Sequence, residues 1–260
     1  MGLFTLGLAY LEINYIESEE DLVVLGKLKD VFSLIGFVLS LLLVFRTNSA
    51  YDRWWEGRKK WGELINNSRN LAIKIDTMTA DKSYHGFFSR MIPNYAYAMK
   101  EHLRLGVKVE ELDLTEEEIV EINKKNHKTS YIAQKMYWKL NEMKKNKELS
   151  EEEFLSIDIN LKTFSDITGS CERIKNTPMP YSYSSFLKKF IFVFVSTIPL
   201  SFVASFGYYS ALIAVFILYV LVSMEILAEE IEDPFGIDEN DLPTDDLCDK
   251  IKANVIEILE

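Results

Sequence analysis

The pattern of hydrophobic and polar positions changes abruptly after residue 45. Residues 31–45 carry no charge, and this apolar run passes without glycine or proline at the junction into a basic, aromatic pattern. At about 1.5 Å per residue the uncharged run is shorter than a hydrocarbon layer of about 30 Å, so a membrane span includes residues from both flanks. The pattern predicts one long helix over residues 31–78 that leaves a membrane.

The residues that follow the apolar run are typical of a cytoplasmic membrane interface. Cations and tryptophans alternate there: Arg46, Arg53, Arg58, Lys59 and Lys60, with Trp54, Trp55 and Trp61 among them. Basic residues gather on the cytoplasmic side of membrane helices, and tryptophan gathers at the interface. The chain after this helix is therefore predicted to lie inside the cell.

A second uncharged block, residues 190–224, predicts a pair of membrane helices. Gly207, with Tyr208 beside it, offers a turn near the middle, and Pro199 removes a backbone donor that would kink the first helix. Lys188 and Lys189 place the start of the block on the cytoplasmic side. We expect a helical hairpin over residues 190–228, and one uninterrupted helix is the alternative, which its length against the bilayer disfavours.

The N-terminal segment predicts only part of a first membrane helix, over residues 1–16. The apolar run before Glu12 is too short to span a bilayer, and we expect Met1 to lie inside that helix. A secretory signal is disfavoured because no cationic segment and no small-residue cleavage site are present. The acidic residues 17–30 are expected to form an outside loop.

Residues 79–189 are charged and amphipathic with few glycines or prolines, which predicts a cytosolic helical region. Two capping boxes, Thr115 with Glu118 and Ser150 with Glu153, mark helix starts. No period-two alternation favours a strand. Residues 229–260 are expected to form an acidic turn and a C-terminal helix. The predicted fold class is an all-α membrane protein, with short transmembrane helices and a cytosolic helical bundle.

Composition excludes several other classes of protein. A net charge of -11 over 260 residues disfavours a nucleic-acid partner, which requires an excess of lysine and arginine. Cys171 and Cys248 lie far apart outside any CxxC pattern, so reduced, buried thiols are expected. His85, His102 and His127 lack metal-ligand spacing, and no phosphate loop or activated nucleophile accompanies them. No enzyme is predicted.

Four stretches, in the same order, resemble the bacterial branch of the bestrophin family. They are residues 45–56 (FRTNSAYDRWWE), 95–104 (YAYAMKEHLR), 171–181 (CERIKNTPMPY) and 229–236 (EEIEDPFG). The resemblance implies a homopentameric channel for monovalent ions in the lipid bilayer, with the helix over residues 31–78 lining a central pore. It also implies that the family's basic, aromatic N-terminal segment is missing from this sequence.

The resemblance assigns two constrictions to the pore. Phe37, Leu41 and Phe45 match the hydrophobic neck, at the spacing i, i+4 and i+8 along one helix face. A fivefold apolar ring would gate by excluding water. The alternative for these residues is contact with lipid or a neighbouring helix. Met179 matches a second constriction at the cytosolic exit, and its alternative is a methionine that fills a core gap.

Acidic residues near the end of the last membrane helix bear on the sign of the ion. A possible acidic vestibule comprises Glu225, Glu229, Glu230 and Glu232. Fivefold symmetry would multiply inward-facing carboxylates into a ring that attracts cations. We therefore predict a cation-selective channel of the inner membrane, multi-pass, with most of its hydrophilic mass in the cytoplasm. A chloride channel of the same architecture and a non-conducting scaffold or regulatory subunit remain as alternatives.

The acidic turn also matches a calcium-binding turn of animal bestrophins. The candidate ligands of a weak calcium site are Asp233, Asp238 and Asp241. Ile237 replaces an acidic position of that turn, and the spacing is not that of an EF-hand. The alternative is an exposed acidic loop shaped by Pro234. No other cofactor is predicted.

Overall fold

The computed structural model describes the backbone of residues 2–15 and 19–260, and the side chains of the same residues except 19–26 and 204. Every regular element in this part of the chain is helical, which confirms the all-α prediction. The helices are α1 (Gly2–Tyr15), α2 (Glu19–Met78), α3 (His85–Leu103), α4 (Glu116–Ile122), α5 (Lys128–Lys145), α6 (Glu151–Asn176), α7 (Tyr181–Thr197), α8 (Pro199–Phe206), α9 (Ser210–Glu232) and α10 (Thr244–Leu259). Short 3-10 turns occur at Lys82–Tyr84, Val109–Glu111 and Gly207–Tyr209.

The chain forms two compact units. The first comprises Met1–Asp52 and Pro178–Glu232, and the second comprises Arg53–Thr177 and Asp233–Glu260. Helix α2 contributes to both, since its first part belongs to the first unit and its last part to the second. Each unit is described separately below.

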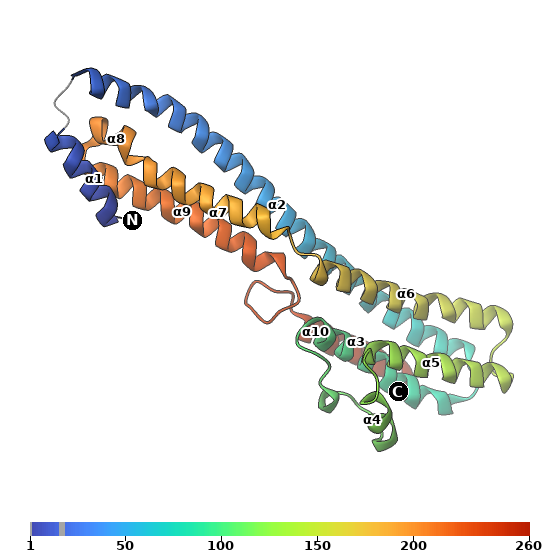
Figure 1. Ribbon diagram of the computed structural model, residues 1–260. Helices are drawn as coiled ribbons and strands as arrows, with labels where there is room; N and C mark the ends of the chain where they lie inside the picture. The colour runs from blue at the N-terminus through green and yellow to red at the C-terminus, as the bar shows by residue number, and fades with distance from the viewer. Residues whose placement is uncertain (1, 16–18) are drawn as a thin grey trace. The chain divides into compact units, whose positions relative to one another are not determined.

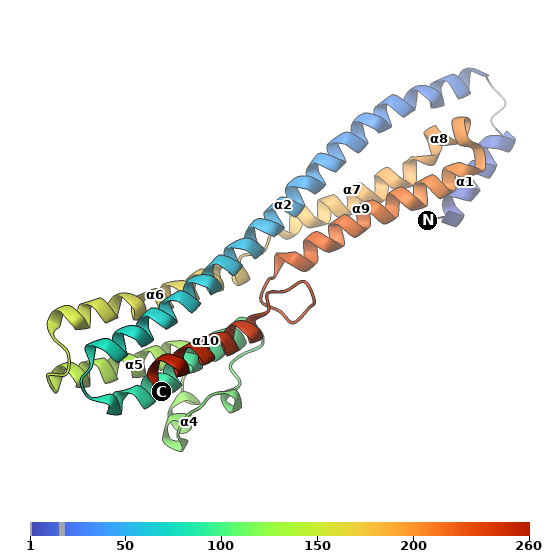
Figure 2. The ribbon, with the colours of Figure 1, turned by 180° about the vertical axis from the view of Figure 1, so that it is seen from behind.

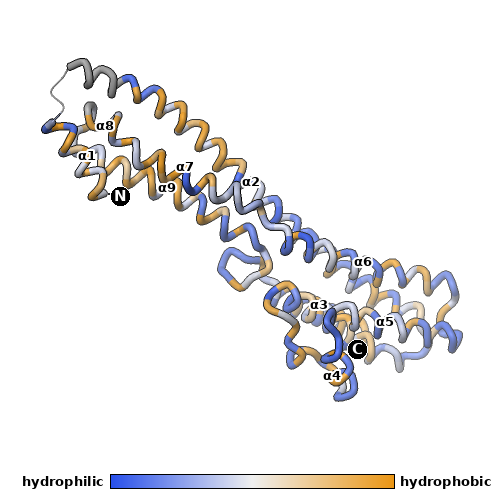
Figure 3. Tube along the Cα trace, in the orientation of Figure 1, coloured by the Kyte–Doolittle hydropathy of each residue, from blue (hydrophilic) through white to orange (hydrophobic). Residues whose placement is uncertain are grey.

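The first unit contains the helices that are able to cross a membrane. Three segments are long and apolar enough by length and composition: Lys27–Met78, Tyr181–Val203 and Gly207–Glu232. Within the unit, α1 packs against α8 and α9, and α7 packs against α9 (Figure 1). Figure 3 shows hydrophobic residues along α7, α9 and the stretch of α2 that lies between its grey start and its hydrophilic second half. Large apolar side chains on these helices are exposed in a single chain, among them Phe192, Leu212 and Phe216.

Close packing of α2 on α7 gives the first unit its core. Leu39 and Leu43 of α2 are buried in one cluster with Leu187 and Val195 of α7. A Cβ atom on Gly36 would lie 3.1 Å from the ring of Phe194, so the missing side chain allows the two helices to approach closely. The hydrophobic interaction between these two helices thus fixes which face of α2 points away from the unit.

Two sequence-based boundaries are wrong. Residues 19–30 belong to α2 and do not form the expected loop, while residues 16–18 of that loop lie outside the described part. The first helix of the hairpin begins at Tyr181, before the predicted start at residue 190. In α2, acidic residues and lysines continue the helix before the uncharged run, because straight-chain charged residues have good helix propensity. In α7, residues 181–189 continue the helix before the uncharged run with tyrosines, serines and two lysines.

The hairpin itself has the predicted turn and break. Helix α7 ends at Thr197 and α8 begins at Pro199, whose ring removes a backbone donor at this point. Gly207 has φ 53°, a conformation that residues with a Cβ rarely adopt, and it separates α8 from α9. The uninterrupted helix considered as an alternative is therefore wrong.

The second unit is a bundle in which α3 packs against α5, α6 and α10 (Figure 2). Its core includes the fully buried rings of Trp61, Phe88 and Phe164. Tyr95 is also buried, and its hydroxyl donates to the carbonyl oxygen of Phe164 at 2.9 Å and lies 2.7 Å from Thr168 Oγ1. Burial raises the pKa of the Tyr95 phenol to about 12. This aromatic contact fixes the register of α3 against α6.

Both predicted capping boxes are confirmed. The Thr115 hydroxyl accepts the N–H of Glu118 at the start of α4, and the Glu118 carboxylate accepts the N–H of Thr115. Ser150 and Glu153 make the same reciprocal pair at the start of α6. Two otherwise unpaired backbone donors are satisfied at each helix start.

Candidate functional site

The three predicted neck residues lie on the face of α2 that points away from the first unit. Phe37, Leu41 and Phe45 are 67%, 44% and 56% exposed in the single chain. The buried residues of this stretch, Leu39 and Leu43, belong to the opposite face. At 3.6 residues per turn, an i, i+4, i+8 series forms one continuous stripe. The stripe is free to contact lipid, another copy of the chain or a pore, which leaves the neck assignment a prediction.

Arg46, the residue after this stripe, is the centre of a buried ionic cluster within the first unit. Its side chain is 1% exposed. Nη2 donates to Glu232 Oε2 at 2.6 Å, and Nη1 contacts Met179 Sδ at 3.0 Å. Its Nε lies 3.8 Å from a carboxylate oxygen of Glu225, which is also buried. One arginine therefore faces two carboxylates at the end of the last membrane helix.

Glu232 connects this cluster to the segment that contains Met179. Its second oxygen, Oε1, accepts the backbone N–H of Met179 at 2.5 Å. The same carboxylate thus binds both the Arg46 guanidinium and the main chain of Met179, the residue predicted to form the second constriction. Met179 itself is half-buried. These contacts fix the backbone at Met179, and they neither support nor contradict the prediction that its side chain forms a constriction.

The predicted acidic vestibule is largely paired with cations. Glu225 and Glu232 face Arg46, and Glu229 accepts a hydrogen bond from Lys188 Nζ at 2.7 Å. Glu230 is exposed. Most of the negative charge that motivated the cation-selective prediction is therefore compensated within the chain, which removes the main physical argument for an acidic ring.

The acidic turn lies in the second unit and is fixed by its apolar residues. Phe235 is almost fully buried, and a Cβ on Gly57 of α2 would lie 3.1 Å from its ring. Trp54 Nε1 donates to the carbonyl oxygen of Asn240 at 3.0 Å, and Arg104 Nε donates to the carbonyl oxygen of Gly236 at 3.2 Å. The turn is thus held by its backbone carbonyls and one buried ring.

The three candidate calcium ligands do not converge. Asp241 Oδ2 accepts the backbone N–H of Asp238 at 2.7 Å, and Asp233 Oδ1 accepts the N–H of Phe235 at 3.4 Å. Asp233, Asp238 and Asp241 are absent from the described groups of acidic or histidine side chains whose ligand atoms meet. The carboxylates serve the turn itself, so the weak calcium site is not supported.

The 95–104 motif forms an ion-pair network that anchors the C-terminal helix. Arg104 Nη2 donates to Asp245 Oδ2 at 2.7 Å and to Thr244 Oγ1 at 3.0 Å, and Lys100 Nζ donates to Asp245 Oδ1 at 2.7 Å. Glu101 is buried beside Lys100 and Arg104. Hydrogen bonds from Arg104 and Lys100 lower the pKa of the Asp245 carboxyl to about 2.

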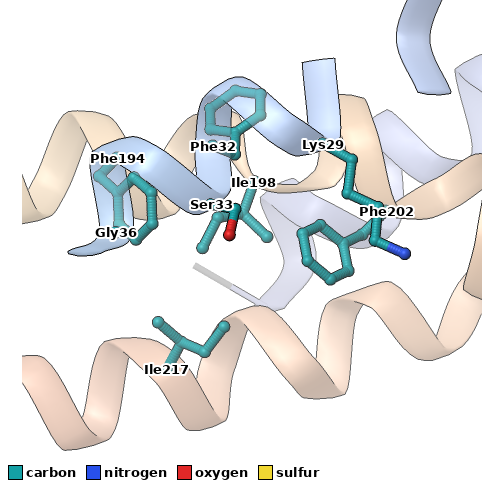
Figure 4. A pocket seen from close by; sticks show the side chains of 8 residues that line it. All are labelled: Lys29, Phe32, Ser33, Gly36, Phe194, Ile198, Phe202 and Ile217. Atoms are coloured by element: carbon teal, nitrogen blue, oxygen red, sulfur yellow. The ribbon is translucent and has the colours of Figure 1, made fainter. Parts of the chain in front are cut away.

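An apolar pocket of about 240 Å³ opens between α2 and the hairpin in the first unit (Figure 4). Helix α2 contributes Lys29, Phe32, Ser33 and Gly36, and the hairpin contributes Phe194, Ile198, Phe202 and Ile217. Phe32 and Phe194 have ring centroids 6.3 Å apart. The lining carries one cation and one hydroxyl, so acyl chains or other apolar groups fit it better than a permeating ion.

The sequence alone did not predict which acidic groups pair with Arg46 or with the histidines. Arg46 was noted only as part of a basic flank, although it is the first charge after the uncharged run and so lies at the level of the helix end. A lone cation at that depth is expected to face protein and pair with acidic groups, which was the available signal. The convergence of His102, His127 and Glu172 carried no local signal, because the three residues come from three separate segments of the chain.

Comparison with known proteins gives one consistent result. The family model described as Bacterial/Fungal Bestrophin protein matches residues 3–257. The chain is 36% identical to the voltage-dependent anion channel-forming protein alr2987 of Nostoc, over 86% of this chain and 75% of that protein. It is 32% identical to the voltage-dependent anion channel-forming protein YneE of Escherichia coli K12, over 87% of this chain and 75% of that protein.

Solved structures agree with the fold. A bestrophin homologue from Klebsiella pneumoniae, determined by Zn-SAD phasing, superposes with a TM-score of 0.89. The similarity covers 99% of this chain and 96% of that chain at 26% identity. A structure described as membrane protein L259A has a TM-score of 0.88, also at 26% identity. The fold of this chain is therefore that of the solved bestrophin homologue.

Proposed function

Because the chain belongs to the bacterial and fungal bestrophins, a family of membrane ion channels, we propose that it forms a homopentameric anion channel. One structural observation supports anion over cation selectivity. Glu225 and Glu232 are paired with Arg46, and Glu229 is paired with Lys188. Carboxylates that are already compensated attract few cations into a vestibule. The names of the curated relatives as anion channel-forming proteins favour the same choice over the cation-selective alternative.

In this proposal α2 lines the pore of the assembled channel. Phe37, Leu41 and Phe45 project from the exposed stripe of each copy and form a fivefold apolar neck. Such a constriction opposes ion passage by excluding water until it widens. Met179 forms a second constriction, and the Arg46 to Glu232 contact fixes its backbone.

The proposed location is the inner membrane, with the second unit in the cytoplasm. The basic and aromatic residues that follow the apolar part of α2 support this orientation, since cations remain on the cytoplasmic side. The exposed apolar side chains of the first unit supply the surface for lipid and for the other copies. Light scattering of the detergent-solubilised protein tests the assembly: five chains are expected, and a monomer would contradict it.

Recording in a planar bilayer under a KCl gradient tests the ion. A reversal potential close to the chloride equilibrium potential is expected. A value close to the potassium equilibrium potential would instead support a cation channel. No current from a folded pentamer would favour the non-conducting scaffold or regulatory subunit.

A variant at Lys188 tests whether the charge of Glu229 influences ion selectivity. Lys188→Gln removes the partner of Glu229 and exposes a negative charge near the end of α9. If Glu229 faces the ion path, the reversal potential should shift toward the potassium value in Lys188→Gln. The double variant Lys188→Gln/Glu229→Gln should restore the native value, because the uncompensated charge is gone.

A further inference from the structure

Two histidines and a glutamate, far apart in sequence, meet in the second unit. His102 lies in the last turn of α3, His127 is the N-cap of α5, and Glu172 lies near the end of α6. Glu172 Oε1 is 2.6 Å from His102 Nε2 and 2.8 Å from His127 Nε2. The two imidazole rings have centroids 4.7 Å apart.

The fold holds these three side chains together. Helix α3 packs against both α5 and α6, which lie beside it in Figures 1 and 2. Two turns before His102, the Tyr95 ring packs on the ring of Phe164, with centroids 5.0 Å apart. The Tyr95 hydroxyl also contacts Thr168, one turn before Glu172. The buried contacts thus set the register that brings His102 to Glu172.

The donor set is chemically suited to a transition metal. One ligand atom from each of these residues lies within 4.8 Å of the others. Zinc binds imidazole nitrogens and carboxylate oxygens at about 2.0 to 2.2 Å, so tetrahedral ligand atoms lie about 3.3 Å apart. The present separations of 2.6 and 2.8 Å need to open by about half an ångström to admit the ion.

The cluster is accessible enough for that adjustment. The side chains of His102, His127 and Glu172 are 26%, 41% and 29% exposed. An ion can therefore reach the cluster from solvent.

The hydrogen bonds around His127 are compatible with a ligand nitrogen. Its Nδ1 accepts the exposed backbone N–H of Ser130 at 3.2 Å and lies 2.8 Å from Thr129 Oγ1. With a metal ion on Nε2, the Nδ1–H would donate a hydrogen bond to the Thr129 hydroxyl oxygen. The Ser130 N–H is exposed, so water can replace Nδ1 as its acceptor.

We propose that His102, His127 and Glu172 form a binding site for a divalent transition-metal ion, with zinc as the best fit, and that water completes the tetrahedral shell. The site would join α3, α5 and α6 of the second unit through one ion. It involves none of the residues predicted to line the pore, so it stands independently of the proposed ion conduction.

Isothermal titration of the intact, detergent-solubilised protein with zinc chloride tests this site. One saturable zinc site per chain is expected. His102→Ala, His127→Ala and Glu172→Gln should each weaken the affinity by more than about tenfold, since loss of a supporting partner alone costs about 10- to 100-fold. The control is His85→Gln, which removes the remaining histidine; His85 Nδ1 contacts the carbonyl oxygen of Leu259 and lies outside the cluster.

Two further measurements separate coordination from a change in folding. Helical circular dichroism and the elution volume should be native-like in Glu172→Gln, which preserves side-chain shape. Thr129→Val should weaken zinc binding by about tenfold without removing a ligand. The visible spectrum of the cobalt-loaded protein should show the intense bands of four-coordinate cobalt. Unchanged zinc affinity in folded His102→Ala and Glu172→Gln, or the absence of a saturable site, would overturn the proposal.

Discussion

At the scale of single residues, Arg46 is the centre of a buried ionic cluster in the first unit. It is buried and faces Glu225 and Glu232, so three ionisable groups share one desolvated position. The two carboxylate oxygens of Glu225 have no hydrogen-bond partner among the described residues. Their stabilisation therefore depends on the charge of Arg46, and removal of that charge leaves them uncompensated.

We expect Arg46→Gln to destabilise the protein by about 3 kcal/mol, in the range found when one partner of a buried ion pair is removed. Thermal unfolding in detergent, followed by circular dichroism, measures the effect. The matched control is Lys188→Gln, which breaks the exposed pair with Glu229 and should cost less than about 1 kcal/mol. Adding Glu225→Gln to Arg46→Gln should recover part of the loss. Equal effects of Arg46→Gln and Lys188→Gln would contradict this view of Arg46.

The Asp245 carboxyl should make the second unit sensitive to acid. Its pKa is about 2 in the folded protein, against an ordinary value of 3.8, so its pairs stabilise the fold above about pH 4. This contribution is lost as the pH falls from about 4 toward 2. At pH 7, Asp245→Asn should cost about 1 kcal/mol, because the side chain is 59% exposed and solvent screens its pairs.

The stability difference between native protein and Asp245→Asn should shrink as the pH falls through this range. Thermal unfolding at several pH values measures it. Asp246→Asn is the control, since Asp246 is exposed on the same helix next to Asp245. A difference that stays constant down to pH 2 would exclude ionisation of Asp245 as its source.

At the scale of elements, the approach of α2 to the acidic turn depends on Gly57. A Cβ at this position would lie 3.1 Å from the Phe235 ring and 3.2 Å from Pro234. Phe235 is buried and has little room to move, so Gly57→Ala should destabilise by about 1 kcal/mol through overpacking. Gly62→Ala on the same helix meets only the flexible Arg58 side chain, at 3.4 Å.

Gly62→Ala should therefore stabilise α2 by up to about 1 kcal/mol, the usual gain in helix propensity. The two substitutions are chemically identical and lie close together in one helix, so opposite signs in thermal unfolding isolate the contact with Phe235. The same sign for both would show that the turn tolerates a wider separation from α2.

The elements were predictable from the sequence where a local chemical signal existed. The hydroxyl and glutamate pairs at Thr115 and Ser150 marked two helix starts, because capping satisfies backbone donors within a few residues. Pro199 and Gly207 marked the break and the turn of the hairpin for equally local reasons. The start of α2 at Glu19 was missed because an acidic segment was taken as a loop, although charge alone does not end a helix.

At the scale of the whole molecule, truncating the residues of the exposed stripe on α2 should change the conductance of the channel. Phe37→Ala, Leu41→Ala and Phe45→Ala should each raise single-channel current or open probability, because a wider neck lowers the barrier to wetting. Bilayer recording measures both quantities. Phe216→Ala is the control, since this phenylalanine is 66% exposed on α9 and has no predicted role in the neck. Unchanged currents in all three folded α2 variants would remove them from the pore.

How chain segments meet could not be predicted from the residues themselves. The family motifs indicated an α-helical membrane channel, yet Glu232 and Arg46 are far apart in sequence, and their pairing depends on how α9 packs in the first unit. The convergence of His102, His127 and Glu172 depends likewise on three helix registers at once. Packing of large buried side chains sets those registers, and no short sequence window contains that information.

The short uncharged runs of the membrane helices have a consequence for the lipid that surrounds them. Residues 31–45 in α2 and 210–224 in α9 each offer only about 15 uncharged residues, or about 22 Å of helix. A hydrocarbon layer of about 30 Å exceeds this length, so either flanking polar residues enter the layer or the bilayer thins locally around the protein, and each carries a modest cost. Lipids with short acyl chains lower that cost, so membrane thickness itself favours or opposes insertion of this chain.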